Sequence, residues 1–445
     1  MRHLLADRDF RRLFTGRLVT NAGDSLYSIA AMWLVWSLTR DPMFTGVAGF
    51  LTMAPSAVQF LFGPLVDRWN VRRILVGTQA VQAVLVLAIP LAAYTGTLSV
   101  WVVLAVMPTV ALINQLVYPA QSAALPRIVD QEDLVDANSA FSLAYQGVDM
   151  VFNAAGGVVI AAFGAVTLYV VDSVTFVAAA LLFAGVYVPP PADQADGDTP
   201  AGGGGEPADA VATDGGDPDG PRADDPVEEA TGYLAELREG FAFLRGTFLV
   251  LLLAGVAFVN SAAGAMLAAL PPFADTVGGA GAYGALMAAF AGGNLAGAVV
   301  AGRLDGYPFG WLNVAIFAVA GVLVTAAAAA ATAGLPFPVV VALFALGFVP
   351  VGASNVLLSA VVQSAVPDSK LGRVSSLLGS ASSFAIPFGT LAGGVLAGAL
   401  GPTAGILALG VAVLALAGYW LAIPRLRTLP PVTDLDTLDR SAAET

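Results

Sequence analysis

The sequence predicts an all-helical integral membrane protein. Three observations predict it: the composition, the length of the apolar runs and the placement of the basic residues. Hydrophobic residues make up 57% of the 445-residue chain and charged residues only 11%, and the mean hydropathy is +0.79. A water-soluble domain has about a quarter charged residues, so this chain cannot cover its exterior for water.

Twelve apolar runs are long enough to cross a bilayer. A transmembrane helix needs about 20 mostly apolar residues, whereas the strands of a membrane barrel have about 10 residues and alternate strictly, which excludes a barrel. The runs lie near residues 14–39, 43–65, 73–95, 98–122, 137–164, 166–188, 247–274, 280–304, 309–333, 336–363, 373–400 and 402–423. They predict twelve transmembrane helices in two halves of six.

The basic residues orient these spans. With the N-terminus in the cytoplasm, seventeen Arg and Lys residues fall in cytoplasmic segments and only Arg40 falls in an external one. Cytoplasmic segments of membrane proteins carry such an excess, so we expect a multi-pass protein of the plasma membrane with both termini in the cytoplasm. Four arginines precede the long first span, which predicts a retained anchor rather than a cleaved signal peptide.

Residues 189–230 separate the two halves and differ from them in composition. They hold twelve acidic residues against one arginine, three consecutive prolines and four consecutive glycines, so most of the net charge of −13 is local. Low hydrophobicity with high charge predicts a disordered cytoplasmic linker.

An amphipathic helix is predicted directly before span seven. Tyr233, Leu237, Phe241 and Leu244 recur at helical spacing and indicate a helix along the inner membrane surface. The predicted organisation is then an N-terminal six-helix half at 1–188, the linker at 189–230, the amphipathic helix with the C-terminal half at 231–423, and a cytoplasmic tail at 424–445.

The residue inventory excludes several classes of function. Cysteine is absent and His3 is the single histidine, which excludes disulfides, Cys nucleophiles, His-based triads and intramembrane zinc sites. The chain has no Gly-Lys-Ser/Thr loop for nucleotides and no basic stripe for nucleic acid. We therefore predict no enzyme activity, no metal, no cofactor and no nucleic-acid partner. One chain holds both halves, so a monomer suffices without an obligatory protein partner.

Two predicted spans carry polar residues along one helical face. They are Arg17, Asn21, Asp24 and Ser28 in span one, and Asn138, Ser142, Gln146, Asp149 and Asn153 in span five. Asp24 and Asp149 lie on the order of 15–18 Å from the inner end, near mid-bilayer. A charge there costs about 2.5–3.5 kcal/mol, which favours a solute cavity. Hydrogen bonding between packed helices is the alternative, and Asp172 is interpreted as a structural or interfacial carboxyl.

The loop after span two carries a specific motif. Gly63, Asp67, Arg68, Arg72 and Arg73 match every defining position of the loop G-x-x-x-D-R-x-x-x-R-[RK], and the chain thereby resembles the major facilitator superfamily. The resemblance implies a twelve-helix, two-half fold in which this loop forms a cytoplasmic gate. In that family the aspartate faces the start of span eleven, where a helix N-terminus stabilises a carboxylate. The expected partners here are Arg127 and the pair Gly372 and Arg373.

Further stretches resemble one efflux branch of that superfamily, the branch of the enterobactin exporter and the macrolide efflux proteins. They lie at residues 9–14, 21–26, 125–138, 236–241 and 366–374. Two features depart from proton-driven drug antiporters of the superfamily. Residues 104–118 lack the mid-span arginine, and residues 152–157 lack the Gly-Pro that precedes a glycine pair.

The resemblance implies export of amphipathic or hydrophobic small molecules by alternating access. Asn260 and Asn355 are expected to line the cavity because the first and fourth spans of each half do so in the family. Asp24 is our predicted protonation switch, with a proton gradient as the driving force. Uptake or uncoupled diffusion of a small solute is the alternative. A non-transporting sensor or scaffold, whose acidic linker binds a partner, is the hypothesis from another class.

Overall fold

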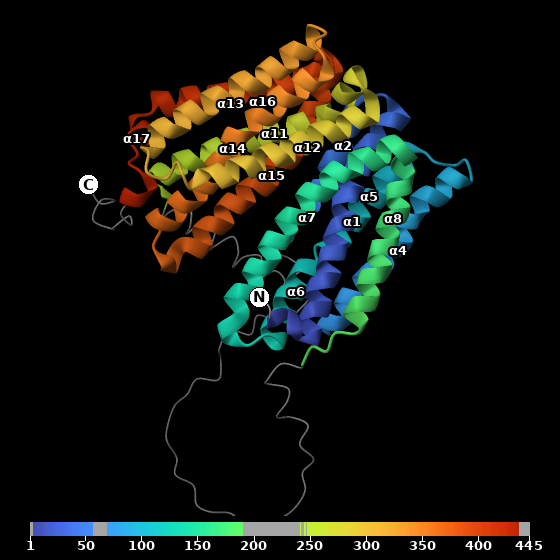
Figure 1. Cartoon of the computed structure of the whole chain (residues 1–445). Coiled ribbons are helices and arrows are strands. Elements are labelled where there is room, and N and C mark those ends of the chain that lie inside the picture. The colour runs from blue at the N-terminus through green and yellow to red at the C-terminus, as the bar shows by residue number, and fades with distance from the viewer. Residues whose placement is uncertain (1–2, 57–68, 190–240, 242–243, 246, 436–445) are drawn as a thin grey trace, which may run out of the picture.

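The computed structural model describes residues 3–56, 69–189, 241, 244–245 and 247–435, and this part of the chain is helical apart from turns (Figure 1). The α-helices are α1 (Arg8–Thr39), α2 (Pro42–Met53), α4 (Val71–Tyr94), α5 (Val100–Asn114), α6 (Val117–Ile128), α7 (Leu134–Phe163), α8 (Ala165–Ala184), α11 (Phe248–Val277), α12 (Gly279–Ala301), α13 (Phe309–Thr332), α14 (Phe337–Ala365), α15 (Asp368–Leu400), α16 (Thr403–Ala422) and α17 (Pro424–Arg427).

A helix occupies each of the twelve predicted runs wherever the structure describes it. Nine stretches of these described residues are long and apolar enough to cross a membrane, which confirms a multi-pass membrane protein. The predicted continuation of α2 lies largely within residues 57–68, which are outside the described residues. Most of the predicted linker and of the predicted amphipathic helix is also outside the described residues.

Span four differs from its prediction as one continuous helix. Helix α5 ends at Asn114, and α6 begins at Val117 after a turn at Gln115 and Leu116. Pro119 explains the break, because a proline inside a helix lacks the N–H donor and clashes with the carbonyl four residues earlier, here that of Gln115.

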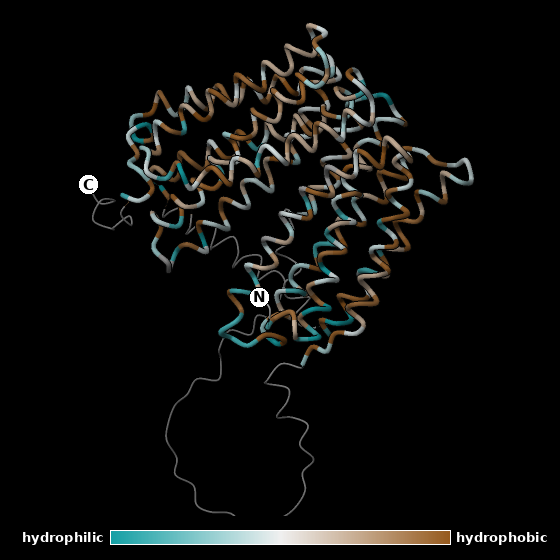
Figure 2. Tube along the Cα trace, viewed as in Figure 1, coloured by the Kyte–Doolittle hydropathy of each residue, from teal (hydrophilic) through white to brown (hydrophobic). Residues whose placement is uncertain are grey.

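The helices form two groups in space, an N-terminal group (α1, α2 and α4–α8) and a C-terminal group (α11–α17) (Figure 1). Large apolar side chains remain exposed on the outside of both groups, among them Val84, Leu181, Val299 and Val411. Figure 2 shows hydrophobic residues along the lengths of the helices. Lipid tails satisfy such surfaces, and helices satisfy their own backbone, as a bilayer requires.

The two ends of the molecule differ in charge. At the end that holds the start of α1, which we call the arginine-rich end, Arg12 and Arg72 donate to the carbonyls of Gly185 and Ala184. These carbonyls close α8, and cations are favourable at a helix C-terminus. At the opposite end, the far end, Arg40 forms an ion pair with Asp275.

Candidate functional site

Contacts between the two groups lie toward the far end. In the described part of the chain, Arg40 at the end of α1 pairs with Asp275 of α11, and the Thr45 hydroxyl donates to the carbonyl of Ala268 over 2.9 Å. The rings of Trp33 and Tyr283 stack with centroids 5.6 Å apart. All these residues lie nearer the far end of their helices. Figure 1 shows the groups converging there, while their other ends lie apart.

Glycines allow the closest of these contacts. A Cβ added at Gly157 of α7 would lie 1.8 Å from the Cα of Gly284 in α12, and one added at Gly46 of α2 would lie 2.9 Å from the Cα of Gly394 in α15. Both pairs are contacts of backbone against backbone, which no side-chain rotation relieves. The far-end closure therefore depends on residues without side chains.

Arg17 is the buried cation of the N-terminal group. It is 8% exposed, and its Nε donates to Gln121 Oε1 over 2.7 Å and to the Tyr145 hydroxyl over 3.1 Å. Tyr145 also donates to Gln121. These bonds join α1, α6 and α7, and the guanidinium lies 5.5 Å from the centre of the Tyr145 ring. Charge-assisted bonds of this kind are stronger than neutral ones.

The two predicted carboxylates bind different partners. Asp149 of α7 accepts from Asn21 Nδ2 over 2.9 Å and from the Ser25 hydroxyl over 2.6 Å, both on α1. Asp24 accepts from Asn114 Nδ2 of α5 over 3.3 Å. Asp149 is exposed and Asp24 is half-buried. These bonds join α1 to α7 and α5, which is the geometry of the helix–helix alternative, and the two carboxylates keep some exposure as a solute cavity would require.

A cavity of about 310 Å³ reaches this region. Its walls are Arg17, Asn114, Gln115 and Tyr118. Arg17 belongs to the predicted face of span one, and Asn114 holds Asp24. Arg17 of α1 thus lines a cavity beside the break between α5 and α6, and Asp24 is joined to its wall through Asn114. We call Arg17, Asn21, Asp24 and Asp149 with their hydrogen-bond partners the polar cluster.

The remaining predicted cavity residues divide by location. Gln146 and Asn153 belong to α7, but their side chains lie outside the described part. Asn260 and Asn355 lie in the C-terminal group, on α11 and α14, and line a separate cavity there. The structure thus brings together the α1 residues and Asp149, but not these asparagines.

The predicted gate is described in part. Gly63, Asp67 and Arg68 lie outside the described residues. Arg72 contacts the end of α8, and the Arg73 backbone N–H donates to Asn70, which caps α4. Arg127 ends α6, while Gly372 and Arg373 lie in the first turns of α15.

Asp172 is fully buried inside the N-terminal group, so its side chain does not lie at an exposed interface, and its structural role stays a prediction. It is 0% exposed on α8, and its Oδ1 accepts from the Thr175 hydroxyl over 3.3 Å. A Cβ added at Gly23 of α1 would lie 2.3 Å from that Oδ1 and 2.1 Å from Thr175 Oγ1. Gly23 therefore lets α1 pack against this buried polar pair.

We expect Gly23→Ala to destabilise the protein by about 1–3 kcal/mol, the usual cost of overpacking a filled core. The methyl group displaces Thr175 and removes a bond to a buried carboxyl. The apparent midpoint of thermal unfolding in detergent measures this. Gly147→Ala is the matched control, because an added Cβ there meets no atom within 4 Å. Equal midpoints for the two variants would refute the assigned packing.

Sequence reasoning missed several members of the polar cluster: Ser25, Gln121 and Tyr145 were not singled out, and Asn114 was ranked as a packing residue. A signal existed for two of them. Ser25 lies four residues after Asn21, and Tyr145 lies four residues before Asp149, so each shares a helical face with a predicted residue. Gln121 had no such neighbour on α6.

Comparisons with known proteins give two kinds of match. Residues 4–192 match the family model described as transmembrane secretion effector. Over 140 residues, the chain is 25% identical to an uncharacterized MFS-type transporter, YvqJ, of Bacillus subtilis (strain 168). That match covers 31% of this chain and 33% of the relative, so it spans about a third of the relative's length.

Solved structures match over nearly the whole chain. A bacterial homologue of the human lysosomal transporter Spinster, inward-facing and occupied, has a TM-score of 0.64 at 14% identity, covering 94% of this chain and 96% of that one. A bacterial homologue of the iron transporter ferroportin, inward-facing, has a TM-score of 0.64 at 15% identity, covering 92% and 97%. At such identities the likeness shows the fold.

Proposed function

We propose that this chain is a secondary transporter of the major facilitator superfamily, which exports amphipathic or hydrophobic small molecules by alternating access; the match of residues 4–192 to the family model and the fold of the solved structures support this. Export is supported by the secretion effector description of the family model that its first 192 residues match. In this proposal the arginine-rich end is cytoplasmic, as the basic residues predict. The two helix groups, residues 1–188 and 231–423, are the moving halves.

The distribution of contacts between the groups carries the proposal. Among the described residues, the ion pair, the ring stack and the glycine contacts between the groups lie toward the far end, and the other ends of the two groups lie apart (Figure 1). With the arginine-rich end in the cytoplasm, this is an inward-facing state. Transport then requires the far-end contacts to part while the cytoplasmic ends close. The Arg40–Asp275 pair is partly exposed, so it adds only about 0–1 kcal/mol to far-end closure.

Proton coupling would act on the hydrogen bonds that join α1 to other helices. A carboxylate accepts bonds from donors on both sides, and protonation turns one of its oxygens into a donor. At Asp149 this weakens the link to Asn21 and Ser25, and at Asp24 the link to Asn114. Such a change biases an element with two packing arrangements. The solute is expected to bind beside these groups.

Flux in proteoliposomes tests the proposal. Purified protein is reconstituted into liposomes, and a pH gradient of either sign is imposed. Accumulation of a cationic dye inside the liposomes is measured by the self-quenching of its fluorescence. A coupled exporter accumulates dye against its gradient under one sign only. Equilibration without accumulation would favour the uncoupled facilitator, which the absent mid-span arginine at 104–118 motivates. No dye movement under any condition would contradict transport of this class of solute.

Deleting residues 192–224 separates transport from the scaffold hypothesis. If the acidic segment is a tether, export by the variant stays within about twofold of the intact chain, because solvated charge runs are commonly spacers. If the chain is a non-transporting scaffold that docks a partner through this segment, the deletion abolishes the cellular function, and neither the variant nor the intact chain gives flux in liposomes. Drug susceptibility of cells and liposome flux, measured side by side on the same variant, distinguish the two.

A further inference from the structure

We propose that the C-terminal group contains a tail site, which takes the apolar chain or ring of an amphipathic solute while the polar part lies at the amide groups of Asn260 and Asn355. The inference rests on the proposed export function and adds a substrate class to it: molecules with one polar head and one extended apolar part. The tail site is a cavity of about 360 Å³ inside the C-terminal group.

Most of the cavity lining lies in the arginine-rich half of its helices. Its lining includes Leu252 and Val256 near the start of α11, Phe317 near the start of α13, and Leu416 and Trp420 near the end of α16. In the proposed inward-facing state this is the half nearer the cytoplasm, from which an exported solute is loaded. A volume of about 300–1,000 Å³ is usual for a site that encloses a small ligand.

The cavity is apolar in effect, although several asparagines line it. None of its lining residues is charged. Asn260, Asn294 and Asn313 each donate to the carbonyl four residues earlier on their own helix, over 2.9 Å in each case. Because these donors are satisfied within the helices, an occupant needs few hydrogen bonds of its own. The lining apart from its asparagines and serines is apolar and favours the hydrocarbon part of an occupant.

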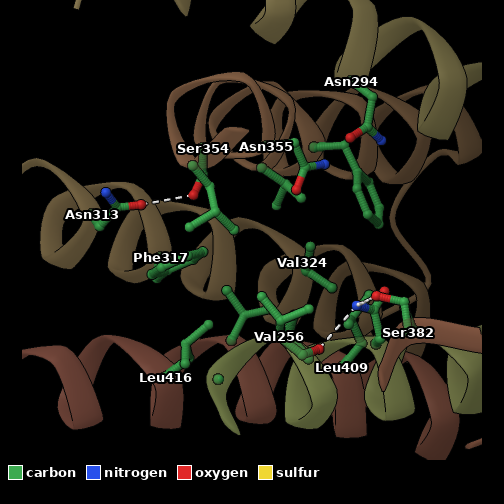
Figure 3. A pocket seen from close by; sticks show the side chains of 18 of the residues that line it. Val256, Asn294, Asn313, Phe317, Val324, Ser354, Asn355, Ser382, Leu409 and Leu416 are labelled. Atoms are coloured by element: carbon green, nitrogen blue, oxygen red, sulfur yellow. Dashed lines mark hydrogen bonds between the residues drawn. The ribbon is translucent and has the colours of Figure 1, made fainter. Parts of the chain in front are cut away.

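Polar groups mark two sides of the cavity (Figure 3). Ser354 donates to Asn313 over 2.7 Å, and Asn260 donates to Ser382 over 3.1 Å. Figure 3 shows Phe317, Val324 and Leu416 among the side chains between Asn313 and Ser382.

The two polar pairs differ in exposure. Asn313 and Ser354 are buried, whereas Asn260 and Ser382 are half-buried and the neighbouring Asn355 is exposed. The cavity thus has a closed inner side and a polar, accessible rim. A solute that enters past the rim buries its apolar part first.

The competing occupant of the cavity is the acyl chain of a bound lipid. The polar side chains at the rim of the cavity favour a transported solute over that lipid. Asn260 and Asn355 present amide groups at the accessible side, whereas other exposed positions of the same helices, such as Phe258 and Val356, are apolar. A polar rim suits a solute whose apolar part lies in the cavity and whose polar head group lies at the rim.

The test uses alkyltrimethylammonium probes with chains of four to twelve carbons and a photoreactive diazirine at the chain end, bound to the full chain in lipid nanodiscs. Val413→Phe fills the cavity from α16, where Val413 is 2% exposed. Val411→Phe adds the same volume to the same helix at a position that is 57% exposed. Val256→Phe fills the cavity from α11 should the first variant not fold.

Chain-end labels are expected on α13 and α16 residues of the cavity. Each added methylene should tighten binding about fourfold until the cavity is full. Filling with Val413→Phe should weaken dodecyl binding at least tenfold and change butyl binding less than twofold, with Val411→Phe like the unmodified chain. Labels found only on residues outside the cavity would overturn the tail site. The same dependence of binding on chain length in Val413→Phe as in the unmodified chain would also overturn it.

Flux of the same probes separates this inference from the proposed function. Dodecyl flux that Val413→Phe leaves unchanged overturns the tail site and leaves export standing. Cavity labelling that depends on Val413, without flux of any homologue, overturns export and leaves the cavity as a binding site.

Discussion

Asp24→Asn is expected to reduce proton-driven flux at least tenfold while leaving solute exchange between the two sides of the membrane within about threefold. The side chain keeps its shape and can still accept from Asn114, 3.3 Å away in the native chain. It can no longer gain or lose a proton, so the step that couples the gradient to the change of state is lost. A tenfold change corresponds to about 1.4 kcal/mol.

The readout is uptake of a labelled solute into inverted vesicles, with and without a pH gradient, beside counterflow at equal pH. Asp136→Asn is the matched control, because it removes one exposed carboxylate from the first turn of α7. Unchanged gradient-driven flux in Asp24→Asn would contradict the coupling role. If Asp149→Asn lost the flux instead, the proton site would be the carboxylate held by Asn21 and Ser25.

The membrane-spanning elements were predictable because their signal is local. Twenty apolar residues in sequence leave a helix as the one available structure in lipid, so the runs and the helices agree within a few residues. The break in span four was missed because hydropathy does not register the missing donor of Pro119. That proline was the sequence signal for the turn at Gln115 and Leu116.

The candidate site was predictable only as faces of helices. Helical spacing grouped Arg17, Asn21 and Asp24 with one another and indicated Asp149 on a second span. The pairing of donors and acceptors depends on how helices rotate against each other. Asn21 turned out to bind Asp149, while Asp24 binds Asn114 from a third helix.

The tail site was beyond sequence reasoning for a different reason. Its lining comes from six helices and contains no charge, so no single span carries a pattern that differs from ordinary packing. An internal volume results from the sum of side-chain shapes around it. The asparagines were visible in the sequence, but their satisfied backbone bonds, which make the cavity apolar, were not.

The location of the cavities and of the glycine contacts suggests how the two states are balanced. Most of the tail-site lining lies in the arginine-rich half of its helices, whereas the described contacts that hold the groups together lie toward the far end. Ligand binding alone does not shift such an equilibrium unless one state binds better. The far-end glycines, which touch no predicted site residue, therefore set the balance separately from solute binding.

Gly157→Val is expected to shift the protein toward the state with its far end open and to reduce transport turnover at least tenfold. The new Cβ would lie 1.8 Å from the Cα of Gly284, a backbone atom that cannot rotate away. Helices α7 and α12 must separate to accommodate the new side chain. The substitution therefore destabilises the state with a closed far end and does not affect the state with an open far end. Gly284→Val should act alike, because the contact is reciprocal.

The chain contains no cysteine, so spin labels on introduced cysteines report distances without background. Met43→Cys with Leu400→Cys reports the far end, and Val135→Cys with Tyr307→Cys reports the arginine-rich end; all four native residues are exposed. In Gly157→Val the first distance should lengthen and the second shorten. Gly147→Val is the control on α7, where an added Cβ meets nothing within 4 Å. A native distance distribution with native turnover in Gly157→Val would mean that the glycine contact does not close the far end.

Reversing a 99:1 preference between the two states takes about 5.5 kcal/mol, and a clash between two backbones is strong enough to supply this free energy.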